Sequence, residues 1–363
     1  LRKIFTDIEK ARAIKQNNGG LSWTPAEILF DNKRYKVDIK LHGYLEDHWD
    51  TNYRFSLKVK IKNNKHILGL KRFTIMKPWS RSVRHTNVFE LLNKNLGIKY
   101  REIEYIDVSL NASKWGLMIL EPKIDNTWLE YSGYSSGPTV NLKNMSSLVD
   151  YSIIDLNKVS SDTHNHLSSP DIEFQNNKVK NTHRHDLLHQ LSLIHSKKNI
   201  DLINILDFNS FAALLVSSLA YGDMHSIYQR NILFYLNPIT NLIEPIPGDQ
   251  TAGTGFKTNL IFNNKGFPRP KHSTGTLVEF PFYYYLKDYP LFWQYVDINL
   301  KKTNKYIRLM KENDNHQTCK FRDCFQDYFN DKSWPVMTKE TISEYLSSIK
   351  NYNISPVKKL TNC

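Results

Sequence analysis

The sequence predicts an α+β fold of two lobes: a β-rich N-terminal lobe containing one helix, and a mainly helical C-terminal lobe. Short runs rich in β-branched and aromatic residues follow one another up to about residue 125, and helical periodicity dominates after residue 182. The intervening stretch is rich in Ser, Asn, Gly and His, which is typical of loops. The predicted divisions are a β-rich lobe at 1–125, a polar connector at 126–182 and a helical lobe at 183–363.

Length and composition set the first limits on function. The chain has 363 residues, 40% of them apolar, which is enough for a substantial core. Its formal net charge of +13 favours anionic partners such as nucleotides, nucleic acid, acidic glycans or phospholipid surfaces. No run approaches the roughly 18 apolar residues of a membrane helix. The sequence begins at Leu1 rather than Met, so removal of a signal or anchor is compatible with it, and an extracytoplasmic or cell-envelope location stays open.

The strand expected at residues 54–62 has one apolar and one cationic face. Apolar residues alternate with basic ones in RFSLKVKIK, and the basic positions include Lys58 and Lys60. Such a face can hold phosphate groups. It can equally be a solvated surface, since alternating lysines keep an exposed strand from pairing with other strands.

A helix is expected between two strands of the β-rich lobe. In the segment SVRHTNVFELLNKNLGI, the spacing of Val88, Leu91, Leu92 and Leu96 is helical, and Gly97 is a typical helix end. The sequence order predicts that this helix packs against the sheet.

The C-terminal lobe contains two clear helical patterns, HDLLHQLSLIHSKK and DFNSFAALLVSSLAYG, and mostly helical sequence around 296–350. The first pattern places His185 and His189 four residues apart, a spacing that could share a metal ion. The glutamate of HExxH and a third ligand are both missing, and histidines in polar segments are typically solvated. Zinc binding is therefore only a secondary alternative.

Two apolar runs on either side of Asn237-Pro238, NILFYL and LIEPIP, predict a β-hairpin. Their pairing would bring Asn231 and Asp249 together at the open end. Asp223, in the loop after the preceding helix, would reach the same place. Amide and carboxylate oxygens are ligands that Mg²⁺ prefers. The alternative is that these residues only form turns.

Several short motifs together resemble the CotH kinase family, the atypical protein kinases first associated with spore coats. They are KLHGYLEDHW, RFSLKVKIK, ILGLKRFTI, VSLNASKWGLMILEP, GDMHSIYQRN and PIPGDQ, and they span about residues 30–255. The resemblance implies a protein-kinase-like two-lobed fold. It also implies ATP and Mg²⁺ as cofactors, and transfer of a phosphoryl group to a hydroxyl.

The resemblance gives Asp223 the place of the catalytic carboxylate, which orients or deprotonates the acceptor hydroxyl. Asn231 and Asp249 take the places of the Mg²⁺ ligands. His225, two residues after Asp223, is expected to hydrogen-bond that carboxylate, to accept the proton itself, or to serve only in the turn.

The sequence contains no kinase-type Gly-rich loop, so side chains are expected to hold the phosphates of ATP. The candidates are Lys58 or Lys60, with Lys77 as an additional one. Glu90, on the helix of the β-rich lobe, is the expected partner of such a lysine. Glu121, at the end of WGLMILE, is expected at a nucleotide-binding hinge.

Three positions depart from the family pattern. His42 stands where the family tends to have Arg, and Asn111-Ala112 replaces Asn-Gly. Gln250 follows Asp249 where a second acidic residue is often seen, which leaves open whether one or two metals bind.

The acceptor is open at this stage. The family implies Ser of a protein, whereas the 12% aromatic content, including EFPFYYYLKDYPLFW, also suits a carbohydrate substrate or simply a packed core. A non-catalytic reading, as a pseudokinase or a basic module for acidic glycans or nucleic acid, remains a separate class. No RNA- or DNA-binding signature is present in the sequence, so a nucleic-acid partner is the weakest of these.

Overall fold

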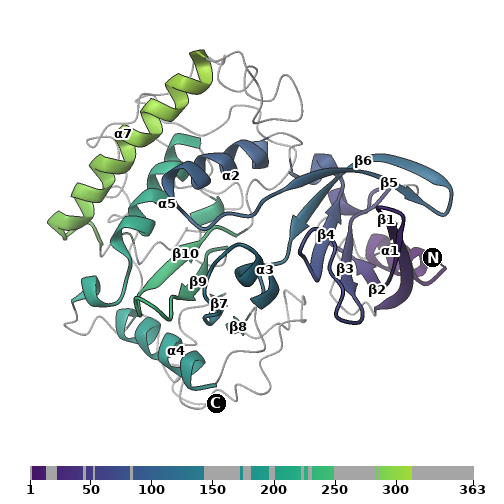
Figure 1. Cartoon of the computed structure of the whole chain (residues 1–363), viewed down its shortest axis with the longest axis horizontal. Coiled ribbons are helices and arrows are strands. Elements are labelled where there is room, and N and C mark those ends of the chain that lie inside the picture. The colour runs from purple at the N-terminus through teal and green to yellow at the C-terminus, as the bar shows by residue number, and fades with distance from the viewer. Residues whose placement is uncertain are drawn as a thin grey trace.

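The computed structural model describes residues 2–13, 23–43, 46–51, 54–81, 85–142, 172–174, 181–195, 201–221, 225–227, 231–248, 283 and 286–312. These residues form an α+β structure with two antiparallel sheets. Figure 1 shows the larger sheet and helix α1 (Arg2–Ala13) on one side of the molecule, with the longer helices and the smaller sheet on the other.

The larger sheet has six strands in the order β1-β2-β3-β4-β6-β5, all paired antiparallel. Its strands are β1 (Thr24–Phe30), β2 (Lys33–Leu41), β3 (Leu57–Ile61), β4 (Arg72–Met76), β5 (Glu104–Leu110) and β6 (Ser113–Pro122). The alternation expected for β3 is confirmed, since Leu57, Val59 and Ile61 are buried while Lys60 is exposed. The apolar face is covered in part by α1, whose Ile4 and Ile8 join the same core cluster.

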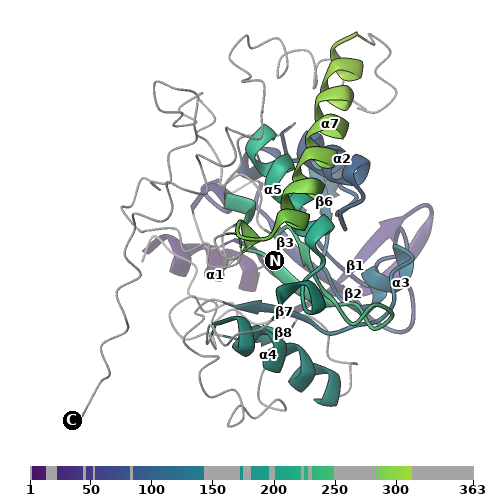
Figure 2. The same ribbon diagram turned by 90° about the vertical axis from the view of Figure 1, so that its left-hand side faces the viewer.

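Helix α2 (His85–Leu96) forms where the sequence predicts, but its described apolar side chains pack in the helical core and not on the larger sheet. Its Phe89, Leu92 and Leu96 belong to the core that it shares with helices of the C-terminal part. Figures 1 and 2 both show α2 alongside α5 (Phe208–Tyr221) and α7 (Pro290–Glu312), and it contacts both. The expectation of a helix packed into the β lobe is therefore wrong. Residue spacing shows that a helix has an apolar stripe, but not which partner buries it.

The second sheet has the order β10-β9-β7-β8 and takes its strands from two distant parts of the sequence. Strands β9 (Leu233–Leu236) and β10 (Ile243–Ile246) form the expected hairpin, while β7 (Thr139–Leu142) and β8 (Ile172–Phe174) come from the stretch expected to be loops. That stretch also contains helix α3 (Asn126–Tyr131), whose Trp128 and Leu129 are buried. Where the structure describes it, the polar connector thus contributes to the core.

The helical side of the molecule is built around α5, which is buried along most of its length. It packs against α7, and α4 (Asn181–His195) contributes Leu187, Leu188 and Leu191 to the same cluster. Short 3-10 turns complete the described elements: Glu46–His48, Pro78–Arg81, Leu202–Asn204 and His225–Ile227. Among the helices that the structure describes, none is long and apolar enough to cross a membrane.

Candidate active site

The β9–β10 hairpin lies between the two hydrophobic cores. On β9, Leu233 and Tyr235 belong to the core of the larger sheet, whereas Phe234 and Leu236 belong to the helical core. This is the period-2 alternation of a strand that is buried on both faces. The hairpin therefore contacts the β-rich part of the molecule directly.

The open end of the hairpin brings Asn231 next to Gly248. The strands pair with Leu233 opposite Ile246, so the residues beyond them continue side by side. A Cβ atom added to Gly248 would lie 1.6 Å from the carbonyl oxygen of Asn231, a separation that only glycine allows. The expected pairing of the two runs is thus confirmed as far as Gly248. Asp249 follows it in sequence and lies outside the described residues.

Arg101 joins this hairpin end to the larger sheet and to α2. Its Nη2 donates to the carbonyl oxygen of Gly248 at 2.5 Å, and its Nη1 donates to the carboxylate of Glu121 on β6. Its Nε lies 3.5 Å from Oε1 of Glu90 on α2, and its backbone N–H donates to Oε2 of Glu90 at 3.1 Å. One buried guanidinium therefore contacts three separate segments of the chain.

Glu90 and Glu121, both expected to be site residues, are thus brought together at a buried position. Glu90 is 2% exposed and Glu121 is 7% exposed. The sequence led us to expect a lysine as the partner of Glu90, and the structure shows Arg101 as one of its partners. Arg101 was missed because it is a single basic residue in REIEYIDV, where its spacing of two from the apolar Ile103 is the signal for an inward position.

Lys58 lies on the same face of the sheet as Glu121. In the strand register, Lys58 is opposite Thr74 on β4, and Thr74 is opposite Glu121 on β6. Directly opposite residues project to the same face of a sheet. Lys58 is half-buried, whereas Lys60, two residues further on, is exposed. Of the two candidates, Lys58 is the better enclosed.

Lys77 is buried and its ammonium pairs with the carboxylate of Asp50. Its backbone N–H donates to the hydroxyl of Ser56 at 3.1 Å, which in turn lies 3.0 Å from Nδ1 of His48. Binding of a phosphate by Lys77 would have to compete with Asp50. The carboxylate of Asp50 thus already occupies the ammonium of Lys77.

A second buried ion pair lies on the same hairpin. The ammonium of Lys99 binds the carboxylate of Glu244 on β10. It also lies 4.9 Å from the ring centroid of Tyr134 and 4.7 Å from that of Tyr235. Burial raises the pKa of Tyr134 to about 12, with Tyr100 and Glu244 adding to the effect. Lys99 and Arg101, two residues apart, thus attach the hairpin to the segment that leads into β5.

The remaining expected site residues can be placed only in part. Asp223 lies outside the described residues. His225 is the first residue of a 3-10 turn, but its side chain also lies outside what the structure describes. His185 and His189 are exposed on α4. Within the described ranges, no group of three or more His, Cys, Asp or Glu side chains is arranged to hold a metal ion.

No protein-family model matches the chain, and no curated protein matches it at the significance required.

Proposed function

We propose that the chain is an ATP- and Mg²⁺-dependent kinase that phosphorylates a hydroxyl group, most directly a Ser of a protein. One observation carries the proposal: the hairpin end formed by Asn231 and Gly248 is attached through Arg101 to Glu121, on the sheet face that also carries Lys58. A nucleotide between two lobes needs a cation for its phosphates and oxygen ligands for its metal. A sheet face with a lysine and a hairpin end with an amide side chain, connected through Arg101, support the proposal.

Within this proposal, the fold is a protein-kinase-like arrangement of two lobes, related to the CotH kinases. Lys58 binds the phosphates of ATP, and Glu121 lies at the hinge. Arg101 holds the hinge, α2 and the hairpin end in a fixed relation through its three contacts. Positioning of this kind supplies much of the catalysis in phosphoryl transfer.

The oxygen ligands fit Mg²⁺ in chemical type. Asn231, half-buried at the hairpin end, offers an amide oxygen, and Asp249 adds a carboxylate directly after Gly248 in sequence. Bound Mg²⁺ would neutralise charge on the phosphates. Asp223 would orient the acceptor hydroxyl and take up its proton, with His225 close to it in sequence.

The test measures turnover of radiolabelled ATP with and without Mg²⁺ for the wild type, Asn231→Ala, Asp249→Ala and Asp223→Ala. Asp288→Ala, an exposed carboxylate paired with Lys287, is the matched control. We expect the three site variants to lose Mg²⁺-dependent turnover while keeping the wild-type circular dichroism spectrum, and the control to retain it. A folded Asp249→Ala variant with full activity would show that the metal assignment is wrong.

The acceptor is tested in the same assay by separating protein and glycan fractions after the reaction. Label in protein Ser supports the proposal as stated. Label confined to glycan would contradict phosphorylation of protein Ser, but it would still support kinase activity. Absence of turnover with every metal, together with salt-sensitive binding of polyanions, would instead favour a non-catalytic basic module.

A further inference from the structure

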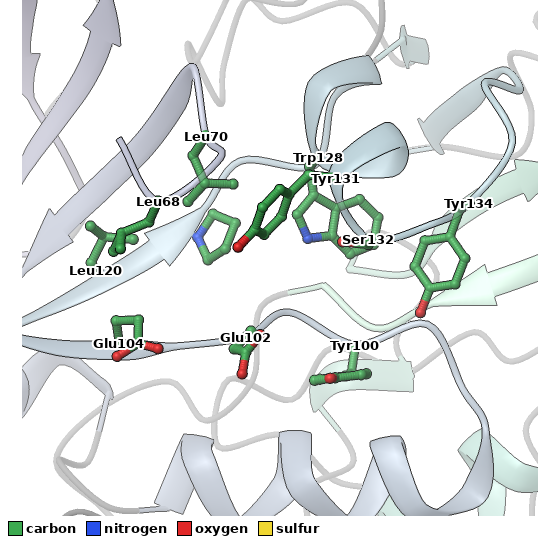
Figure 3. A pocket seen from close by; sticks show the side chains of 11 residues that line it. Leu68, Leu70, Tyr100, Glu102, Glu104, Leu120, Trp128, Tyr131, Ser132 and Tyr134 are labelled. Atoms are coloured by element: carbon green, nitrogen blue, oxygen red, sulfur yellow. The ribbon is translucent and has the colours of Figure 1, made fainter. Parts of the chain in front are cut away.

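A pocket of about 400 Å³ lies between α3 and the segment that leads into β5. Figure 3 shows Glu102 and Glu104 along one wall, with Tyr131 on the opposite side and Tyr134 at the end. Tyr100 and Trp128 complete the aromatic lining. The volume is typical of small-molecule sites, which are lined by aromatic side chains with a few polar groups.

The pocket is separate from the candidate active site. Tyr100, Glu102 and Glu104 line it, whereas Arg101, between the first two, binds Glu121 and Gly248. Likewise Leu120 lines the pocket and the adjacent Glu121 does not. Neighbouring residues of these two segments therefore face different sites, one the pocket and the next the candidate active site.

Tyr131 is an exposed aromatic ring held in position by a glycine. It is 60% exposed, although it is a large aromatic residue at the end of α3. A Cβ atom at Gly69 would lie 2.1 Å from Cδ2 and Cε2 of Tyr131, so the ring rests in the space that the missing side chain leaves. Gly69 also has a φ of +73°, which disfavours any other residue there. The exposed ring is thus prearranged for contact with a ligand.

The polar groups of the pocket call for a ligand that donates hydrogen bonds. The carboxylate oxygens of Glu102 and Glu104 accept hydrogen bonds, while the hydroxyl of Ser132 can accept or donate. The phenol of Tyr134, whose pKa burial raises to about 12, stays protonated and able to donate. Alcohols and cations are two classes of ligand that satisfy such acceptors.

Cations are the less suitable of these two classes, because lysines of the chain already lie against the aromatic walls. The ammonium of Lys94 is 5.3 Å from the ring centroid of Tyr100, and that of Lys99 is 4.9 Å from the centroid of Tyr134. The chain as a whole carries a formal charge of +13, which repels a further cation. A neutral ligand with several hydroxyl groups avoids this repulsion and still donates to the carboxylates.

We propose that this pocket binds a neutral saccharide, which stacks on Tyr131 and donates hydroxyl hydrogen bonds to Glu102 and Glu104. The apolar face of a sugar ring covers an aromatic ring while its hydroxyl groups point to the polar wall. Binding here does not depend on phosphoryl transfer at the candidate active site.

The experiment is isothermal titration of the full chain with neutral tetrasaccharides of glucose, N-acetylglucosamine and mannose. We expect saturable binding of at least one, weakened about tenfold or more in Tyr131→Ala and restored in Tyr131→Trp, because Trp again offers an aromatic face to the sugar ring. Glu102→Gln should weaken binding as well. Leu29→Ala is the control, since Leu29 is 65% exposed and lies on β1, at the opposite edge of the sheet from β5.

Any of three results would overturn the inference. The first is failure of all three tetrasaccharides to bind, and the second is binding that Tyr131→Ala leaves unchanged. The third is saturable binding of tetramethylammonium or a tetra-arginine peptide, lost in Tyr131→Ala, which would assign the pocket to cations. Turnover of ATP by Tyr131→Ala is measured in parallel. If turnover is retained, loss of saccharide binding in this variant is independent of the proposed kinase activity.

Discussion

Gly248 lies directly against the carbonyl oxygen of Asn231, so closely that a Cβ atom at position 248 would be 1.6 Å from it. Gly248→Ala should therefore force the two strands apart at the open end of the hairpin. We expect loss of Mg²⁺-dependent ATP turnover and a fall in the free energy of unfolding of about 1–3 kcal/mol, as for other overpacked sites. Urea denaturation and the ATP assay measure the two effects.

Gly97→Ala is the control for this substitution. Gly97 has a φ of +76°, but among the described residues nothing lies within 4 Å of an added Cβ atom. The variant should lose roughly 1 kcal/mol of stability from backbone strain and keep its turnover. Equal turnover in Gly248→Ala and Gly97→Ala would contradict the role assigned to the hairpin end.

Arg101 is expected to be among the most sensitive positions for stability. Arg101→Met leaves Glu90 and Glu121 buried without their guanidinium, and removal of one partner from a buried ion pair costs about 3–5 kcal/mol. Arg101→Lys keeps the charge but has no planar group that could contact three segments at once. It should fold and lose turnover. Chemical denaturation with the ATP assay tests both variants, and a fully active Arg101→Lys would contradict the positioning role.

Lys58 and Lys60 provide a matched pair on one strand. Lys58→Met should lower kcat/KM for ATP by about 100-fold, the typical effect of removing one charge-stabilising donor. Lys60→Met should change it by less than about twofold, because Lys60 is exposed and surface charges contribute little. Steady-state kinetics at fixed Mg²⁺ distinguish the two variants. A larger effect at Lys60 would move the phosphate contact to that residue.

Asp125 should make stability depend on pH. Burial raises its pKa above the usual 3.8, although the carboxylate caps α3 by accepting from the backbone N–H of Trp128 at 3.1 Å. For a raised pKa, the stabilising contribution is complete below pH 3.8 and is lost as the pH rises through the raised value. The Asp125→Asn variant retains a capping side chain. The difference in the free energy of unfolding between wild type and this variant should therefore fall as the pH rises from 3.8 through the raised pKa.

Urea denaturation of wild type and Asp125→Asn at a series of pH values measures this difference. Asp125→Ala, which removes the cap, should be less stable by about 1 kcal/mol at neutral pH. Parallel stability curves for wild type and Asp125→Asn would show that burial does not perturb this carboxylate.

The sequence predicted those features that depend on local pattern. The alternation in RFSLKVKIK identified the buried face of β3, and the runs around Asn237-Pro238 identified the hairpin. It did not predict what α2 packs against, because an apolar stripe fits any complementary surface. It also missed the strands in the connector, where Thr139 and Asn141 are polar residues buried by pairing with β9.

In the candidate site, Glu90 and Glu121 were identified from sequence, but the residue that joins them was not. The contacts of Arg101 connect it with residues 11, 20 and 147 positions away, and a pattern within one segment contains no information about such pairs. Long-range ion pairs of this kind become visible only when the fold is known.

The position of α2 in the chain has a consequence for how the protein folds. Strands β4 and β6 are neighbours in the larger sheet, yet the helix between them in sequence is buried in the other core. We therefore expect assembly of the two cores to depend on contacts between residues distant in sequence, which slow folding. A fragment cut after residue 125 would leave the apolar stripe of α2 without its partners. We expect the two cores to melt in a single cooperative transition.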